Sequence, residues 1–190
     1  RTENILSPVC HGWLDLISGR ALRWVGSLDA AEILLNRALT LFALQSEDQA
    51  DVYIEQAVIL RYRNHWHDAR QVLARAMIIY EWSGIRDGLD RCYHELAQIS
   101  LDENRPSDAL SQLEKLSEWS SRTWGIASQA YLDLERYGEA FDGIDRAQAL
   151  LPPQHPNQGR LQAARGHIYD GLGEFDKAIQ HLLMALDLLD

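Results

Sequence analysis

The chain has 190 residues, of which 46% are hydrophobic and 24% are charged, the proportions of a soluble globular protein. Its formal net charge of −10 disfavours general binding to nucleic acid, and no apolar run approaches the roughly 20 residues needed to cross a bilayer. Leucine (29) and alanine (21) dominate, whereas valine and threonine together number 8. Because unbranched side chains lose little rotamer freedom in a helix, this balance predicts a helical protein. The acidic charge and the short apolar runs predict that it contacts neither nucleic acid nor a membrane.

Cysteine usage and the amino-terminal sequence favour the cytoplasm. The two cysteines, Cys10 and Cys92, cannot form a disulfide framework and are predicted to be reduced thiols. The first 30 residues show no basic stretch followed by an apolar one, which is the pattern of a secretory signal.

One pattern occurs five times along the chain: a turn is followed by a polar or aromatic residue and then by alanines at helical spacing. The alanines that open these segments are separated by 38, 40, 31 and 38 residues and stand at Ala31, Ala69, Ala109, Ala140 and Ala178. Apolar residues also precede each turn at helical spacing, so each unit is predicted to be a helical hairpin. Regular spacing of hairpins indicates a stacked repeat rather than a mixed fold.

These patterns predict a single all-helical domain over residues 1–190. Its amino-terminal segment 1–11 is expected to be irregular, and the hairpins are expected at about 12–44, 50–83, 88–119, 121–151 and 158–190. No polar capping helix follows the last predicted helix. We therefore expect its apolar face to be covered by further repeats of a longer protein or by a second copy in a homodimer.

The hairpins resemble tetratricopeptide repeats (TPR). The fifth hairpin is the most similar, because the family's glycine, tyrosine, aromatic and alanine positions hold Gly166, Tyr169, Gly173, Phe175, Ala178 and Ala185. The resemblance implies an α-solenoid, a right-handed superhelix of about five hairpins whose first helices line a concave groove. Three of the four spacings between hairpins, 38, 40 and 38 residues, are longer than the repeat of the family, and in this respect the chain looks like the TPR regions of bacterial signalling ATPases and LuxR-type regulators.

Alignment to the family places polar and aromatic side chains in that groove. The predicted partner-binding residues are Trp13, Arg20, Arg23, Trp24, Arg61, Tyr62, Arg91, His94, Gln98, Arg122, Gln129, Arg160 and His167. Arginine forks suit carboxylates, and rigid aromatic rings are typical of interaction hot spots. The groove is therefore predicted to bind a protein or peptide, and an acidic segment is favoured.

Some of these residues also have a purely structural interpretation. Arg91, Arg122 and Arg160 recur at one step of three successive hairpins. Arginines near helix starts can, however, pair with acids of a neighbouring hairpin. Trp13 and Trp24 can likewise pack against a preceding helix.

The functional prediction is a non-enzymatic protein-interaction module. No nucleotide-binding loop, hydrolase elbow or zinc-protease motif occurs, so no catalytic, cofactor-binding or metal-binding residues are predicted. The alternative is a sensor domain of a larger signal-transduction or transcription regulator. In that function the same array would bind a small ligand or an inhibitory protein.

Overall fold

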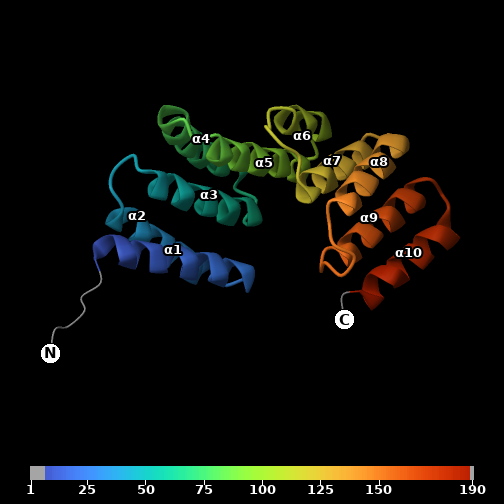
Figure 1. Ribbon diagram of the computed structural model, residues 1–190, viewed down its shortest axis with the longest axis horizontal. Coiled ribbons are helices and arrows are strands. Elements are labelled where there is room, and N and C mark those ends of the chain that lie inside the picture. Colours follow the sequence, from blue (N-terminus) through green and yellow to red (C-terminus); the bar gives the residue numbers. More distant parts are fainter. Residues whose placement is uncertain (1–6, 189–190) are drawn as a thin grey trace. The chain divides into compact units, whose positions relative to one another are not determined.

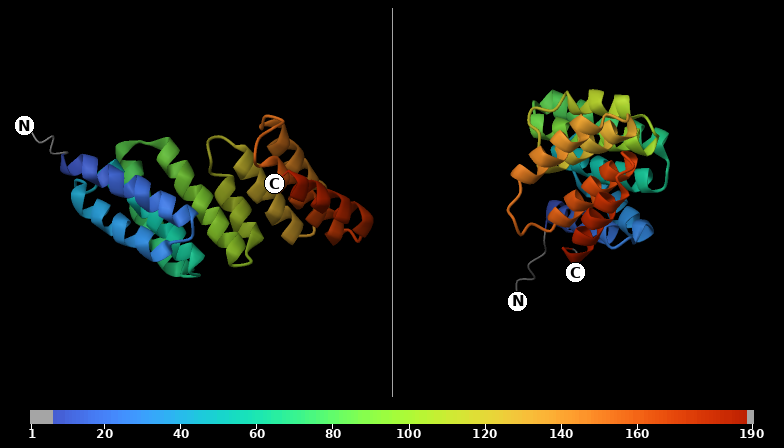
Figure 2. Two further views of the ribbon diagram at one scale, coloured as in Figure 1. Left: turned by 90° about the horizontal axis from the view of Figure 1, so that it is seen from below. Right: turned by 90° about the vertical axis from the view of Figure 1, so that its right-hand side faces the viewer.

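The computed structural model describes residues 7–188, and every regular element within that range is an α-helix (Figure 1). The helices are α1 (Pro8–Trp24), α2 (Leu28–Leu41), α3 (Glu47–Tyr62), α4 (Trp66–Ser83), α5 (Arg86–Asp102), α6 (Pro106–Leu113), α7 (Ser121–Asp133), α8 (Tyr137–Ala149), α9 (Gln158–Gly171) and α10 (Phe175–Asp187). Helices α1 and α2, α3 and α4, α7 and α8, and α9 and α10 pack as hairpins, as two further views show (Figure 2). The predicted all-helical fold of successive hairpins is confirmed.

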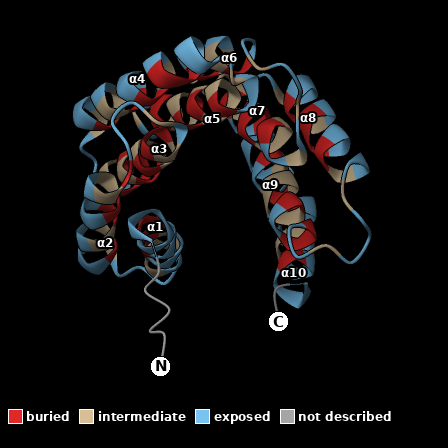
Figure 3. Cartoon of the chain, turned by 60° about the vertical axis from the view of Figure 1, so that its left-hand side comes forward, coloured by how far each residue is buried: buried red, intermediate tan, exposed pale blue. Residues whose placement is uncertain are grey.

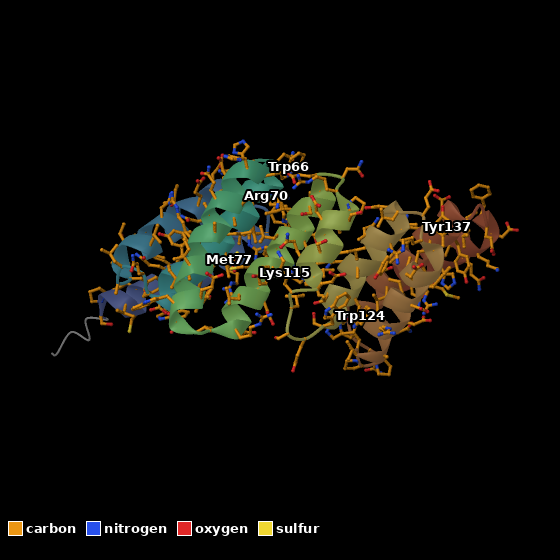
Figure 4. All side chains as sticks on the ribbon, turned by 90° about the horizontal axis from the view of Figure 1, so that it is seen from above. Trp66, Arg70, Met77, Lys115, Trp124 and Tyr137 are labelled. Atoms are coloured by element: carbon orange, nitrogen blue, oxygen red, sulfur yellow. The ribbon has the colours of Figure 1, made fainter. Side chains whose placement is uncertain are left out.

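The second helix of every hairpin begins three residues before the alanine of the sequence repeat. These helices open at Leu28, Trp66, Pro106, Tyr137 and Phe175, and Figure 4 labels two of the aromatic residues, Trp66 and Tyr137. The repeat alanines themselves are at most 4% exposed. Close crossing of the helices explains this burial, since a β-carbon on Gly166 would lie only 2.8 Å from Cγ of Leu182 on the paired helix. Small residues are therefore required where the two helices of a hairpin meet.

One residue in each hairpin turn adopts a left-handed backbone conformation. These residues are Gly26, Asn64, Asn104, Glu135 and Gly173, with φ between 56° and 81°. Glycine has no β-carbon and asparagine tolerates this region, whereas most other residues are strained in it. The turn geometry is thus the same in all five hairpins, and Glu135 is the residue least suited to it.

Replacing Glu135 with glycine is expected to raise the free energy of unfolding by about 0.5–1 kcal/mol, because the steric cost of the left-handed conformation is removed. Urea denaturation of the two proteins measures the change. Glu135→Ala is the control, since alanine keeps the β-carbon and gains nothing from this effect. Equal stabilisation by glycine and alanine would contradict the strain at this turn.

Helix α1 begins earlier than the sequence led us to expect. The Ser7 hydroxyl accepts a hydrogen bond from the backbone N–H of Cys10, and Pro8 occupies the first turn, where no amide donor is needed. Residues 8–11 are therefore helical, which corrects the expectation of an irregular segment up to residue 11. Ser7 caps this helix, and residues 1–6 of the segment lie outside the described residues.

The chain divides into two compact units, whereas a single domain was expected. Unit 1 comprises residues 1–95 and unit 2 comprises residues 96–190, so the boundary falls within α5. The two halves of α5 pack against different helices. Arg91 in the first half bonds to α3, whereas Ala97 in the second half belongs to a core cluster with α6 and α7.

Each unit has its own buried core, coloured red in Figure 3. In unit 1, Leu35 of α2 packs with Val52 and Ile59 of α3. In unit 2, a separate cluster joins Ile144 of α8 to Ile168 of α9. The second helix of one hairpin therefore also covers the first helix of the next hairpin within each unit.

Candidate functional site

The predicted groove residues lie on the first helices of the hairpins in both units. We call the surface of α1, α3 and the start of α5 the unit 1 face, and the surface of α7 and α9 the unit 2 face. Helix α1 contacts α3, and α7 contacts α9, so first helices are neighbours within each unit. Eight of the thirteen predicted residues lie in unit 1, and the other five, from Gln98 onward, lie in unit 2.

Two arginines of the unit 1 face bind one buried carboxylate. Nε of Arg20 donates to Oε1 of Glu55 at 2.8 Å, and Nε of Arg23 donates to Oε2 at 3.0 Å. The side chains of Glu55 and Arg23 are 7% and 9% exposed, whereas that of Arg20 is 41% exposed. This arrangement links α1 to α3, and the charge of Glu55 is neutralised by arginines of the same unit.

Arg91 takes part in a second network. Its Nη1 donates to Oδ1 of Asp51 at 2.5 Å, and the Tyr80 hydroxyl donates to the same oxygen at 2.6 Å. Burial, with a smaller contribution from Asp51, raises the pKa of the Tyr80 hydroxyl and keeps it protonated as a donor. Asp51 therefore joins α3 to α4 and to the start of α5.

Arg61 and His94 flank a third carboxylate. Nε of Arg61 lies 3.7 Å from Oε2 of Glu95, and Nδ1 of His94 lies 3.7 Å from Oε1. All three side chains are mostly buried. Together with the Glu55 and Asp51 networks, these ion pairs place most charges of the unit 1 face opposite a partner within the unit, whereas Nε2 of His94 is buried and has no hydrogen-bond partner among the described atoms.

The aromatic residues of the unit 1 face differ in their accessibility. Trp13 packs edge-on against Phe42 with ring centroids 5.7 Å apart. Trp24 is 70% exposed and Tyr62 is 52% exposed. Each of these two rings has the guanidinium of the preceding arginine over its face, at 5.1 Å for Trp24 and 4.7 Å for Tyr62.

The unit 2 face has a different character. Arg122 and Gln129 lie seven residues apart on α7, Arg160 and His167 lie seven residues apart on α9, and all four are exposed. This spacing places the members of each pair on the same side of their helix. Two amides bond along their own helices, Gln129 to Asp133 at 2.7 Å and Gln98 to Asp102 at 3.5 Å.

Small residues separate these polar side chains. Gly125 stands between Arg122 and Gln129, and Ala163 stands between Arg160 and His167. A β-carbon on Gly125 would meet no described atom within 4 Å beyond its chain neighbours and the backbone of its own helix. The middle of the unit 2 face is therefore an open surface between two arginines and two hydrogen-bonding side chains.

Two residues that matter here, Glu55 and Gly125, are not among the predicted partner-binding residues. A carboxylate within the apolar pattern of a helix requires a buried partner, which is the signal that Glu55 offered. A glycine in a helix interior lowers helix propensity, so its presence at Gly125 indicates a packing or functional requirement. The first signal does not identify the helix that carries the partner of Glu55, and the second does not show that Gly125 lies on an open surface.

Other aromatic contacts consolidate unit 2. Trp119 and Trp124 have centroids 4.3 Å apart, and the guanidinium of Arg146 lies 4.6 Å from the Trp124 ring centroid. Figure 4 labels Trp124 on α7. Tyr169 of α9 stacks on His181 of α10 with an interplanar angle of 12°. These contacts hold neighbouring helices together and leave the unit 2 face as described.

The described residues hold no group of three or more histidine, cysteine, aspartate or glutamate side chains arranged to bind a metal ion. Burial raises the pKa of the Cys92 thiol to about 12, so this group is a protonated core residue at neutral pH. Within residues 7–188, the helices are too short or too polar to cross a membrane.

Residues 159–188, which comprise the fifth hairpin, match the family model of the tetratricopeptide repeat. No curated protein matches the chain.

Solved structures of helical repeats share the fold over nearly the whole chain. TPR-like repeats of a protein described as a kinesin light chain of Podosopora anserina align with a TM-score of 0.67 at 18% identity, covering 95% of both chains. PilF of Pseudomonas aeruginosa aligns with a TM-score of 0.71 at 16% identity, covering 97% of this chain and 77% of that one. MamA of Desulfovibrio magneticus gives 0.63 at 14% identity and covers 94% of each chain. This likeness shows that the chain has a TPR-like helical-repeat fold.

Proposed function

We propose that the chain is a non-enzymatic protein-interaction module and that the unit 2 face binds a protein or peptide segment. The resemblance of its hairpins to tetratricopeptide repeats supports the general role. The open surface at Gly125, between exposed Arg122 and Arg160 on one side and exposed Gln129 and His167 on the other, carries the assignment to this face.

The distribution of charge on the unit 2 face favours a particular ligand chemistry. Arg122 and Arg160 stand near the amino-terminal ends of α7 and α9, whereas Asp133 and Asp170 stand near the carboxy-terminal ends. Arginine forks and the positive ends of the helix dipoles both attract carboxylates. We therefore expect an acidic part of the ligand over the two arginines. Gln129 and His167 can exchange hydrogen bonds with its backbone.

Gly125 allows this proposal to be tested with little disturbance of the fold. Because its β-carbon position is open, Gly125→Trp should leave the thermal melting temperature nearly unchanged while its ring covers the binding surface. In pull-downs from native lysate, a partner recovered by the wild-type chain should be lost with Gly125→Trp and with Arg122→Glu/Arg160→Glu.

Gly125→Ala is the matched control and should retain the partner. The same partner recovered equally by wild-type, Gly125→Trp and Arg122→Glu/Arg160→Glu baits would place the interaction elsewhere. If no protein is enriched by any of the baits, a protein partner in that lysate is contradicted.

A further inference from the structure

The unit 2 face carries its charges in two groups, at opposite ends of its helices. Arg122 and Asp133 lie eleven residues apart on α7, which is about three turns, so both stand on one side of that helix. Arg160 and Asp170 lie ten residues apart on α9, and all four side chains are exposed. Each first helix of this face therefore has a positive side chain near its start and a negative one near its end.

The two positive side chains share one end of the face, and the two negative ones share the other. Helix α8 returns the chain between α7 and α9, so α7 and α9 run in the same direction. Their carboxy-terminal ends are neighbours, because a β-carbon on Gly171 of α9 would lie 3.4 Å from Cδ1 of Leu132 on α7. Asp133 and Asp170 are the chain neighbours of these two residues, and so both carboxylates stand at that end.

These charges are not paired inside the unit as those of the unit 1 face are. Within residues 7–188, no salt bridge forms at Arg160, Asp133 or Asp170. Asp133 accepts a hydrogen bond from the neutral amide of Gln129 at 2.7 Å, which leaves its negative charge in place. On the unit 1 face, by contrast, the carboxylate of Glu55 is bound by two arginines. The charges at both ends of the unit 2 face can therefore interact with a ligand.

We propose that the segment bound by the unit 2 face is extended and bipolar, with an acidic residue at the arginine end and a basic residue at the aspartate end. The inference rests on the proposed function and specifies its ligand. Eleven residues of helix rise about 16 Å, and an extended chain covers that distance in about five residues. The acidic and basic residues of the ligand should therefore stand about four to six positions apart.

The middle of the face suits the uncharged part of such a segment. Gly125 and Ala163 add little side-chain volume there, and a β-carbon on Gly125 would meet open space. Gln129 donates its amide N–H to Asp133, so its Oε1 can accept a backbone N–H of the ligand. A wholly acidic segment would extend its negative charge over Asp133 and Asp170, where like charges repel. A basic residue at that position replaces the repulsion with attraction.

Random peptides displayed on phage supply the probe, with a length of about twelve residues, twice the longest expected spacing. Peptides are selected on the wild-type 190-residue chain, and those that also bind Gly125→Trp are discarded. The remainder are synthesised with a fluorescein label, and fluorescence anisotropy measures their Kd. We expect these peptides to carry an acidic and a basic residue about four to six positions apart. Replacing either one with glutamine should weaken binding about three- to tenfold.

The direction of one effect separates a bipolar ligand from a wholly acidic one. Asp133→Asn/Asp170→Asn should weaken binding of a bipolar peptide about three- to tenfold, whereas it would tighten binding of an acidic peptide. The fold should tolerate both changes, because a negative charge near a helix carboxy terminus opposes the helix dipole. Asp142→Asn/Asp187→Asn, at exposed positions of α8 and α10, is the control. It changes the net charge equally and should leave Kd unchanged.

Two results would overturn the inference and leave the proposed function intact. One is a set of selected peptides whose basic residue is absent or can be replaced without loss of affinity. The other is unchanged or tighter binding of the selected peptides by Asp133→Asn/Asp170→Asn. In both cases the peptides still require the open surface at Gly125. A selection that yields no peptide lost with Gly125→Trp would instead contradict binding at the unit 2 face, and with it both proposals.

Discussion

Replacing Glu55 with alanine is expected to lower the free energy of unfolding by about 3–5 kcal/mol. Glu55 accepts hydrogen bonds from Arg20 and Arg23, and its own side chain is only 7% exposed. Arg20 can turn to solvent when the carboxylate is removed. Arg23 is 9% exposed and would remain as a buried charge without this partner. The loss is therefore dominated by the desolvated guanidinium of Arg23 rather than by the ion pair itself.

Denaturant unfolding of Glu55→Ala measures this loss, and an exposed ion pair of the same chain provides the control. Arg136 and Glu139 are 49% and 47% exposed, so Glu139→Ala should cost at most about 1 kcal/mol. Equal losses in the two variants would show that burial of the Glu55 network does not determine its contribution.

Replacing Gly88 with alanine is expected to cost about 1–3 kcal/mol, although alanine has the higher helix propensity. A β-carbon on Gly88 would lie 2.3 Å from Cδ1 of the Tyr80 ring. The ring cannot turn away freely, because its hydroxyl donates to Asp51, which also binds Arg91. The new methyl group must therefore displace α5 from Tyr80 or break the hydrogen bond to Asp51.

The same substitution at Gly125 is the control for this effect, since a β-carbon there meets open space. Gly125→Ala should stabilise the chain by about 0.5–1 kcal/mol through helix propensity alone. Thermal unfolding followed by circular dichroism should therefore move the two variants in opposite directions. A stabilised Gly88→Ala variant would mean that Tyr80 does not occupy this space.

Local sequence signals were sufficient to predict the hairpins. The small side chains of Ala31, Ala69 and their counterparts indicate that the two helices of a hairpin cross closely. This requirement acts on single positions, so it can be recognised in the sequence. Asn64 and Asn104 could stand in for a turn glycine because asparagine tolerates a left-handed conformation. The start of α1 was also encoded locally, because Ser7 followed by Pro8 is a helix-start signal. The expected irregular segment, residues 1–11, did not take this signal into account.

The arrangement of charges on the candidate site could not be predicted in the same way. Arg20 and Glu55 are 35 residues apart, so their contact depends on how α1 and α3 pack. The sequence placed Arg91, Arg122 and Arg160 at equivalent steps, but it did not tell that Arg91 bonds to Asp51 in unit 1. The surroundings of each helix therefore decide what an arginine at a given repeat position binds.

Hydrogen–deuterium exchange of the chain, with and without a partner recovered by the wild-type bait, tests the central claim most directly. Binding at the unit 2 face predicts slower exchange in α7 and α9 and unchanged exchange in α2 and α4. Gly125→Trp should abolish the difference, whereas Gly125→Ala should preserve it. Protection that leaves α7 and α9 unchanged and appears in unit 1 or on α10 would contradict the assignment of the binding surface.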